Sequence, residues 1–220
     1  MKINLEKLQA EKAAQVESFL KQLTAQMAEL PTLVVIGGFA VRAHGAKRLS
    51  LDGDIMVTHS THGELRDQFT LFKNPRLGKE QFSTPFGAEI DVYVEDQHKL
   101  RIPFDEIQAY VEKRNGLWVA CAEHLLILKL DALRDRRHSD KGAKDIEDIF
   151  VLVSQAQFKH QPVLKDRMTA DDWQLLDEII GTPGHWQQFT QHDHKKAATL
   201  QKKALGTLKA LRGPRSMEIE

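Results

Sequence analysis

Residues 33–57 read LVVIGGFAVRAHGAKRLSLDGDIMV, and the order of features in this stretch decides the fold. The apolar run over residues 32–36 predicts a short buried strand. Gly37 and Gly38 follow it directly and predict a tight turn into a short helix over residues 39–44. A strand that turns through glycine into a helix brings backbone N–H groups to one point, which suits a bound phosphate.

Acidic residues open the next strand. Asp52 and Asp54 precede the apolar residues 55–58 and are two positions apart, so we expect both on one face of the sheet. Asp91 lies in EIDVYV, residues 89–94, on the face opposite the apolar positions of that strand. If this strand lies beside that of Asp54, the three carboxylates converge. The alternative is that Asp52 and Asp54 are turn residues and that Asp91 is solvated.

Three converging carboxylates raise one another's pKa unless a positive charge lies among them. Mg²⁺ (or Mn²⁺) supplies that charge, and two such ions can bind the attacking and the leaving oxygen of a displacement. We therefore expect Asp52, Asp54 and Asp91 to bind metal. Arg48 and Ser50, just upstream, could contact a phosphate or hold the loop, and the two glycines also have a plainer use as a tight turn.

The composition is that of an ordinary globular protein. The chain has 220 residues, 41% hydrophobic and 28% charged, enough for one large domain or a compact domain with a helical extension. Lys plus Arg and Asp plus Glu both total 31, so the net charge indicates no nucleic-acid partner. No apolar run approaches the ~20 residues that span a bilayer, and the N-terminus lacks an apolar signal segment. With Cys121 as the single cysteine, these features predict a cytoplasmic protein without a membrane partner.

The rest of the chain divides near Ala122 into a mixed half and a helical half. Asn115 and Gly116 predict a hairpin turn that pairs residues 109–112 with residues 117–121. The other predicted elements are helices at 3–29, 61–72, 122–137, 140–156, 170–181 and 184–211, and strands at 81–84 and 88–94.

These elements predict an α/β (α+β) fold. A small mixed sheet flanked by helices occupies residues 1–121, and a helical region over residues 122–220 completes the cleft.

A family resemblance follows from these residues. Residues 37–54 resemble the opening signature of the nucleotidyltransferase (polymerase-beta-like) superfamily. The matching pattern is Gly37-Gly38-x-Ala40-Val41-x-x-His44-Gly45-x-x-Arg48-x-Ser50-x-Asp52-x-Asp54. More narrowly, the pattern is similar to that of the AbiEii abortive-infection toxin family. Asp91, within an apolar strand, matches the third carboxylate of the superfamily. Two departures are Gly38, where many members have Ser, and Gly53, where an apolar residue is more usual.

A second match lies downstream, in EHLLILKLDALR (residues 123–134) and KDIEDI (residues 144–149). In the family a lysine of the first block and an acid of the second belong to the active site. The resemblance therefore implies roles for Lys129 and for Asp145 or Asp148, with the choice between the two acids left open.

The resemblance implies transfer of a nucleoside monophosphate from an NTP to an acceptor hydroxyl, with release of pyrophosphate. Asp52 and Asp54 would hold two metal ions, and Asp91 would bind the ion nearer the attacking hydroxyl and help to deprotonate it. The Gly37-Gly38 turn and Lys129 would hold the triphosphate, while the acid of the second block orients Lys129 or the acceptor.

The partners implied by the family are an NTP, a tRNA or other RNA acceptor, and a cognate antitoxin protein. The alternatives are an antibiotic-modifying nucleotidyltransferase and a catalytically silent nucleotide- or protein-binding module on the same fold. A basic run near the expected cleft is either a solvated loop or a docking site for a phosphate-bearing acceptor; it consists of Arg134, Arg136, Arg137, Lys141 and Lys144.

Overall fold

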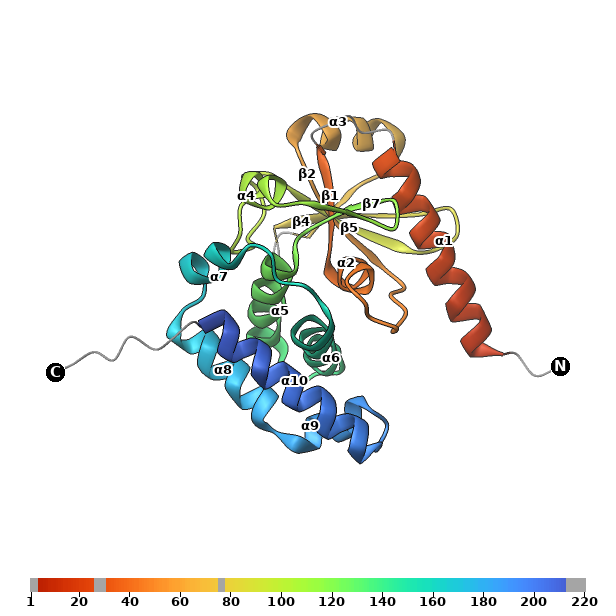
Figure 1. Ribbon diagram of the computed structural model, residues 1–220. Helices are drawn as coiled ribbons and strands as arrows, with labels where there is room; N and C mark the ends of the chain where they lie inside the picture. Colours follow the sequence, from red (N-terminus) through yellow and green to blue (C-terminus); the bar gives the residue numbers. More distant parts are fainter. Residues whose placement is uncertain (1–3, 26–30, 75–77, 213–220) are drawn as a thin grey trace.

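The computed structural model describes residues 4–25, 31–74 and 78–212 (Figure 1). Their strands form a seven-stranded mixed sheet in the order β3-β4-β5-β2-β1-β7-β6. The β2–β5 and β1–β7 pairs are parallel and the other pairs are antiparallel. The strands are β1 (Leu33–Ile36), β2 (Gly53–Val57), β3 (Phe72–Asn74), β4 (Lys79–Ser83), β5 (Glu89–Val94), β6 (Glu112–Arg114) and β7 (Leu117–Val119).

Helices cover both faces of this sheet, and every described element from Ala122 onward is helical, as the sequence predicts. Figure 1 shows α1 and α3 on one side and α2, α5 and α6 on the other. The helices are α1 (Leu5–Ala25), α2 (Gly37–Ala43), α3 (His59–Gln68), α4 (Phe104–Ala109), α5 (Ala122–Arg136), α6 (Asp140–Gln155), α7 (Gln161–Arg167), α8 (Ala170–Gly181), α9 (Pro183–Phe189) and α10 (His194–Arg212). No helix in these described ranges combines the length and the apolar character needed to cross a membrane.

The centre of the sheet has one face for the core and one face for polar groups. All four residues of β1 are buried, since helices lie on both sides of it. In β5, burial alternates along the strand, so that Ile90, Val92 and Val94 pack into the core while Asp91 and Tyr93 lie on the other face. The polar side chains therefore face the α2–α5 side.

Gly53 permits a close approach between the sheet and α1. A Cβ on Gly53 would lie 2.7 Å from Ile90 Cδ1 and 3.5 Å from Leu20 Cδ2. Aromatic side chains extend the same layer, where the rings of Phe69 and Phe82 stack with centroids 4.4 Å apart. The departure from an apolar residue at position 53 thus makes room for the side chain of α1 that covers β2.

Several predicted boundaries in the first half are wrong. Phe72, expected at the end of a helix, lies in β3, because α3 ends at Gln68. Residues 109–111 lie outside β6, since the sequence pattern gave no signal for the short helix α4 before it. The helix predicted over residues 3–29 is α1, with residue 3 and residues 26–29 outside the described part of the chain.

The predicted helix over residues 184–211 is two helices, α9 and α10. Gln191 and His192 interrupt it with positive φ angles of 54° and 67°, in which a right-handed helix cannot continue. The apolar periodicity runs through the break and so conceals it. The short helix α7 was also not predicted.

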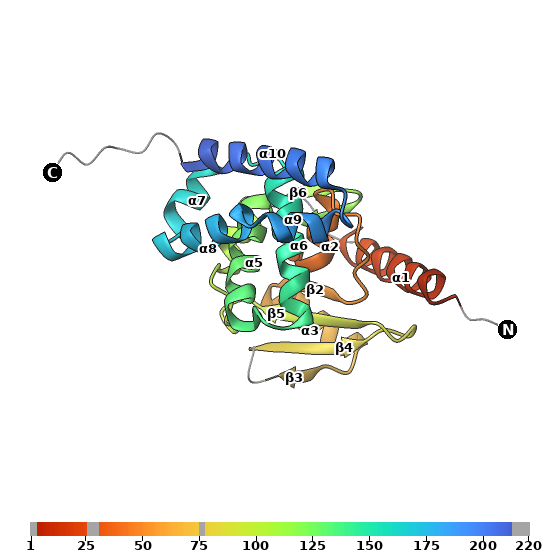
Figure 2. The same cartoon turned by 90° about the horizontal axis from the view of Figure 1, so that it is seen from below.

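Helices α8, α9 and α10 pack on the side of α5 and α6 that faces away from the sheet (Figure 1 and Figure 2). Helix α6 contacts α5 on one side and α10 on another. The fully buried Trp186 of α9 stacks on Phe150 of α6 with ring centroids 4.0 Å apart and donates its Nε1–H to Ile180 O at 2.8 Å. These contacts hold α6 rigidly beside the polar face of the sheet.

The substitution Gly53→Val should destabilise the protein by about 1–3 kcal/mol, because the new methyl groups overlap Ile90 and crowd Leu20. Urea denaturation measures the change. Gly63→Ala is the matched control: position 63 is helical and a Cβ there meets nothing within 4 Å, so we expect a gain of up to about 1 kcal/mol. Equal effects at the two positions would contradict the close packing of α1 on β2.

Candidate active site

Asp54 and Asp91 lie side by side in neighbouring strands. The parallel register of β2 and β5 makes them direct partners, and both side chains are on the polar face of the sheet. Cross-strand partners in adjacent strands have Cβ atoms about 5 Å apart. The convergence of these two acids, which the sequence predicted on condition that the strands are neighbours, is therefore a consequence of the strand order.

The carboxylate of Asp54 lies against the glycine turn between β1 and α2. Gly37 has a positive φ of 64°, and a Cβ at this position would lie 2.1 Å from Asp54 Oδ2. Only glycine meets both requirements, since other residues would be strained by this φ and would collide with the carboxylate. The first glycine of the turn thus brings the backbone into contact with the acid.

Lys129 of α5 binds both acids that the resemblance left as alternatives. Its Nζ donates to Asp145 Oδ1 at 3.1 Å and forms an ion pair with Asp148 Oδ2 at 2.7 Å. Asp145 and Asp148 are three residues apart on α6 and only 2% exposed, so both face α5. Neither acid alone positions the lysine.

The three acids Asp91, Asp145 and Asp148 each have a cation partner. Lys79 at the start of β4 donates to Asp91 Oδ2. Arg136 Nε donates to Asp145 Oδ2 at 2.7 Å. Among the residues that the structure describes, the Asp54 carboxylate alone in this group makes no hydrogen bond or ion pair. The Asp54–Asp91 pair therefore has one direct cation partner, Lys79, for two carboxylates, and the acid without a partner is Asp54.

This imbalance changes the acidity of Asp54. Burial first, and then the negative charge of Asp91, raise its pKa from 3.8 to about 6. Lys129, Lys79 and Arg136 act in the opposite direction but do not compensate. Near neutral pH the carboxylate is largely ionised and inadequately neutralised, which is the condition in which it binds a cation most strongly.

The neighbouring groups keep their ordinary protonation states. Burial alone would lower the pKa of Lys129, but the carboxylates of Asp148 and Asp145 outweigh it, so its pKa is raised and the ammonium stays charged. Burial, together with Asp54 and Asp91, raises the pKa of Tyr93, so its phenol stays protonated. The polar face thus presents a cation and a neutral donor beside the two acids.

Ser50 lies against the second glycine of the turn. A Cβ on Gly38 would lie 2.8 Å from Ser50 Oγ, and this hydroxyl donates to the carbonyl oxygen of Asp52 at 3.1 Å. Ser50 therefore occupies the space beside Gly38 and holds the backbone just before β2. Asp52 itself is exposed at this point, and its role as a metal ligand stays a prediction.

Arg48 holds the loop in this structure. Its guanidinium donates to Asp148 Oδ1 at 2.8 Å and lies 3.4 Å from Glu147 Oε2. The loop between α2 and β2 is thereby tied to α6. These contacts agree with the structural role of Arg48, and its contact with a phosphate stays a prediction.

The donor chemistry of the acid pair fits a hard divalent cation. Two carboxylates in register, one of them without a cation partner, provide the oxygen ligands that Mg²⁺ and Mn²⁺ prefer. Within residues 4–25, 31–74 and 78–212, no group of three or more His, Cys, Asp or Glu side chains is arranged to hold a metal ion. A complete metal site therefore needs a further ligand beyond Asp54 and Asp91.

Sequence reasoning missed Lys79 and Tyr93, and it named Arg136 only as part of a basic run near the expected cleft, without its partner Asp145. The place of Arg136 at the site could be predicted in part, because Arg136 lies seven residues after Lys129 on α5 and so shares its helix face. The place of Lys79 could not be predicted, since its position beside Asp91 depends on the β4–β5 pairing. The basic run around Arg136 is largely committed to ion pairs: Arg134 with Asp131 and Asp172, Arg136 with Asp145, and Arg137 with Glu178.

No family model and no curated protein matches the sequence. The fold is similar to that of JHP933 from Helicobacter pylori, with a TM-score of 0.54 and 16% identity over 96% of this chain and 95% of that chain. An antigenic nucleotidyltransferase-like protein from Paracoccidioides brasiliensis gives a TM-score of 0.47 at 16% identity, covering 88% of this chain and 93% of that chain. The antibiotic-resistance factor ANT(2'')-Ia gives 0.44 at 14%, covering 86% and 96%. The likeness to JHP933 shows a shared fold that includes the C-terminal helices.

Asp54→Asn should stabilise the protein above pH 6. Because the pKa of Asp54 is about 6 in the folded protein and 3.8 ordinarily, its ionisation opposes folding above pH 6, and this penalty disappears below pH 3.8. In metal-free buffer we expect a gain of about 1–3 kcal/mol at pH 7.5 and almost none at pH 4. Chemical denaturation at the two pH values measures it.

Asp91→Asn is the matched control, because Lys79 already neutralises Asp91 and would lose its partner. This variant should gain less than Asp54→Asn at pH 7.5. An equal gain in both, or a gain in Asp54→Asn that does not depend on pH, would show that Asp54 is not the uncompensated charge.

Proposed function

We propose that this protein is a metal-dependent nucleotidyltransferase, which transfers a nucleoside monophosphate from an NTP to an acceptor hydroxyl and releases pyrophosphate. The observation that carries the proposal is the uncompensated carboxylate of Asp54, beside Asp91 and under the Gly37 turn. The resemblance of residues 33–57 to the opening signature of the polymerase-beta-like superfamily supports it independently. A binding module without catalytic activity has no need for an acid pair that opposes folding.

The proposed metal ligands are Asp52, Asp54 and Asp91. Mg²⁺ or Mn²⁺ at these carboxylates would neutralise them and stabilise the negative charge on the attacking and leaving oxygens. Asp52, exposed just before β2, supplies the ligand that the acid pair lacks. The Ser50 hydroxyl holds the backbone of Asp52 in place just before β2. The side chain of Asp52 would therefore need only a limited movement to bind the metal.

The triphosphate would lie between the glycine turn and α5. Gly37 and Gly38 carry no side chains of their own, so a phosphate could approach their backbone and accept hydrogen bonds from its N–H groups. The Lys129 ammonium, held by Asp145 and Asp148, neutralises phosphate charge without being drawn away into solvent. The two acids of α6 therefore act as positioning residues for Lys129.

The reaction is an in-line displacement at the α-phosphorus. The acceptor oxygen forms the new bond, the bond from the α-phosphorus to the bridging oxygen of the β-phosphate breaks, and pyrophosphate leaves. Asp91 is the proposed acceptor of the hydroxyl proton. Catalysis consists mainly of positioning and charge neutralisation, since the protein contributes no covalent step.

Asp54→Ala should abolish transfer of label from an α-³²P-labelled NTP to total RNA, while leaving the protein folded. The reason is that it removes the acid with no other cation partner, and EDTA should have the same effect on the unaltered protein. Each of the four NTPs is tested separately. Asp67→Ala, at an exposed position of α3, is the control and should retain full activity. Undiminished labelling by Asp54→Ala would refute the assignment.

The resemblance to AbiEii proteins extends the proposal to the toxin of a toxin–antitoxin pair, with tRNA as the acceptor. Expression in a bacterium should then arrest growth, and Asp54→Ala should relieve the arrest because it removes catalysis. Colony counts after induction measure this. Growth arrest that persists in the variant would contradict a catalytic toxin. Labelling of a hydroxylated antibiotic in place of RNA would favour the drug-modifying alternative.

A further inference from the structure

The last helix carries a strong local charge on a protein whose net charge is zero. Helix α10 reads HKKAATLQKKALGTLKALR and contains no acidic residue. Its basic residues are Lys195, Lys196, Lys202, Lys203, Lys209 and Arg212. Such a concentration of one sign along 19 residues attracts a partner of the opposite sign.

These lysines differ from the lysines of the N-terminal helix. On α1, Lys7 lies 3.9 Å from Glu11 and Lys21 lies 2.7 Å from Glu17. On α10 the five lysines are all exposed, and none forms an ion pair with any residue in the described part of the chain. The nearest acid in sequence, Asp193, accepts a hydrogen bond from the Lys196 backbone N–H at 2.9 Å. The positive charge of these lysines is therefore available to a binding partner.

The lysines lie along a line. Lys195, Lys202 and Lys209 are seven residues apart, so they fall on one face at intervals of about 10 Å along the axis. Lys196 and Lys203 flank this line. We call these five residues the α10 lysine face. Regularly spaced, fully charged side chains match a repeating anion and do not match a single small ligand.

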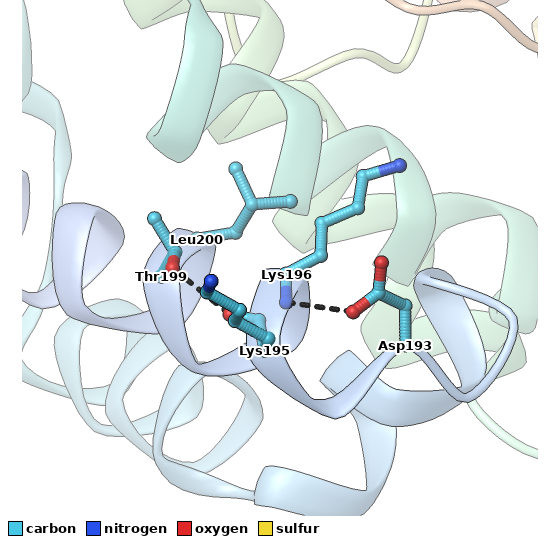
Figure 3. A pocket seen from close by; sticks show the side chains of 5 residues that line it. All are labelled: Asp193, Lys195, Lys196, Thr199 and Leu200. Atoms are coloured by element: carbon cyan, nitrogen blue, oxygen red, sulfur yellow. Dashed lines mark hydrogen bonds between the residues drawn. The ribbon is translucent and has the colours of Figure 1, made fainter.

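A shallow, open depression at the start of the helix adjoins this face. It has a volume of about 350 Å³ and is lined by Asp193, Lys195, Lys196, Thr199 and Leu200. Figure 3 shows Lys196 and Leu200 projecting to the same side of the helix. An ammonium beside an aliphatic surface can accommodate a phosphate and the sugar attached to it.

The opposite side of α10 is packed against protein. Ala197, Ala204, Leu208 and Leu211 are buried, at no more than 4% exposure. Leu205 is the large apolar side chain of α10 that is exposed, so the helix has no broad apolar face to insert into a lipid bilayer. The charge pattern without an apolar face favours a nucleic acid over a membrane.

We propose that the α10 lysine face binds the phosphate backbone of RNA. Identification of that RNA as the acceptor rests on the proposed function. Helix α10 packs on α6, which carries Asp145 and Asp148 at the site, so helices α10 and α6 both lie between the lysine face and the site. Because packed helix axes are about 8–10 Å apart, an RNA bound to this face has to extend over roughly 20 Å or more to reach the site.

The test uses the full chain with Lys195, Lys202 and Lys209 changed to Gln, and fluorescence anisotropy with labelled total tRNA in the absence of NTP. The variant should bind roughly tenfold more weakly at physiological salt, and the slope of log affinity against log salt should fall by about 2. The matched control removes three exposed lysines elsewhere, as Lys7→Gln, Lys73→Gln and Lys165→Gln, and should bind as the unaltered protein does. Circular dichroism should be the same for all three proteins, because every altered side chain is exposed.

Equal binding by the α10 variant and the control, or no binding of tRNA by the unaltered protein, would overturn the proposal. So would loss of binding to vesicles of anionic lipid with tRNA binding unchanged. Asp54→Ala separates this proposal from the enzymatic one, since it should bind tRNA normally and fail to label it. Normal labelling by the α10 variant would refute a role in presenting the acceptor.

Discussion

The structure around the site depends on the carboxylate of Asp54, which is held beside Asp91 without a cation of its own. Register between β2 and β5 brings the two acids together, and the partial burial of Asp54 weakens the screening of their repulsion by water, which raises the pKa of Asp54. Folding tolerates this because the neighbouring acids are neutralised, each by a lysine or an arginine. The remaining negative charge is a specific feature of the site and is located on the Asp54 carboxylate.

The other parts of the site are arranged around this carboxylate. Gly37 permits the backbone to contact it, and Lys129 acts on it from α5 without binding it. Asp145 and Asp148 keep the lysine charged and fix its position. The C-terminal helices matter to the site because the packing of Phe150 against Trp186 holds α6, and with it both acids, in place.

Much of this arrangement could be predicted from local sequence. The alternation in EIDVYV placed Asp91 opposite the core, and the glycine turn after β1 located the site. What could not be predicted depends on pairing between distant strands: the ion pair of Lys79 with Asp91 requires the β4–β5 register. The break at Gln191 and His192 depends on two positive φ angles that apolar spacing does not reveal. Asp52 was predicted with the other two acids; in the structure its side chain is exposed, and its convergence with them stays a prediction.

The most direct test is crystallographic, with Mn²⁺ and a non-hydrolysable NTP analogue soaked into crystals of the protein. The account predicts an anomalous peak within coordination distance of both Asp54 and Asp91, with the triphosphate against Gly37, Gly38 and Lys129. Full occupancy of the nucleotide without a peak at this acid pair, or a manganese site elsewhere only, would contradict it.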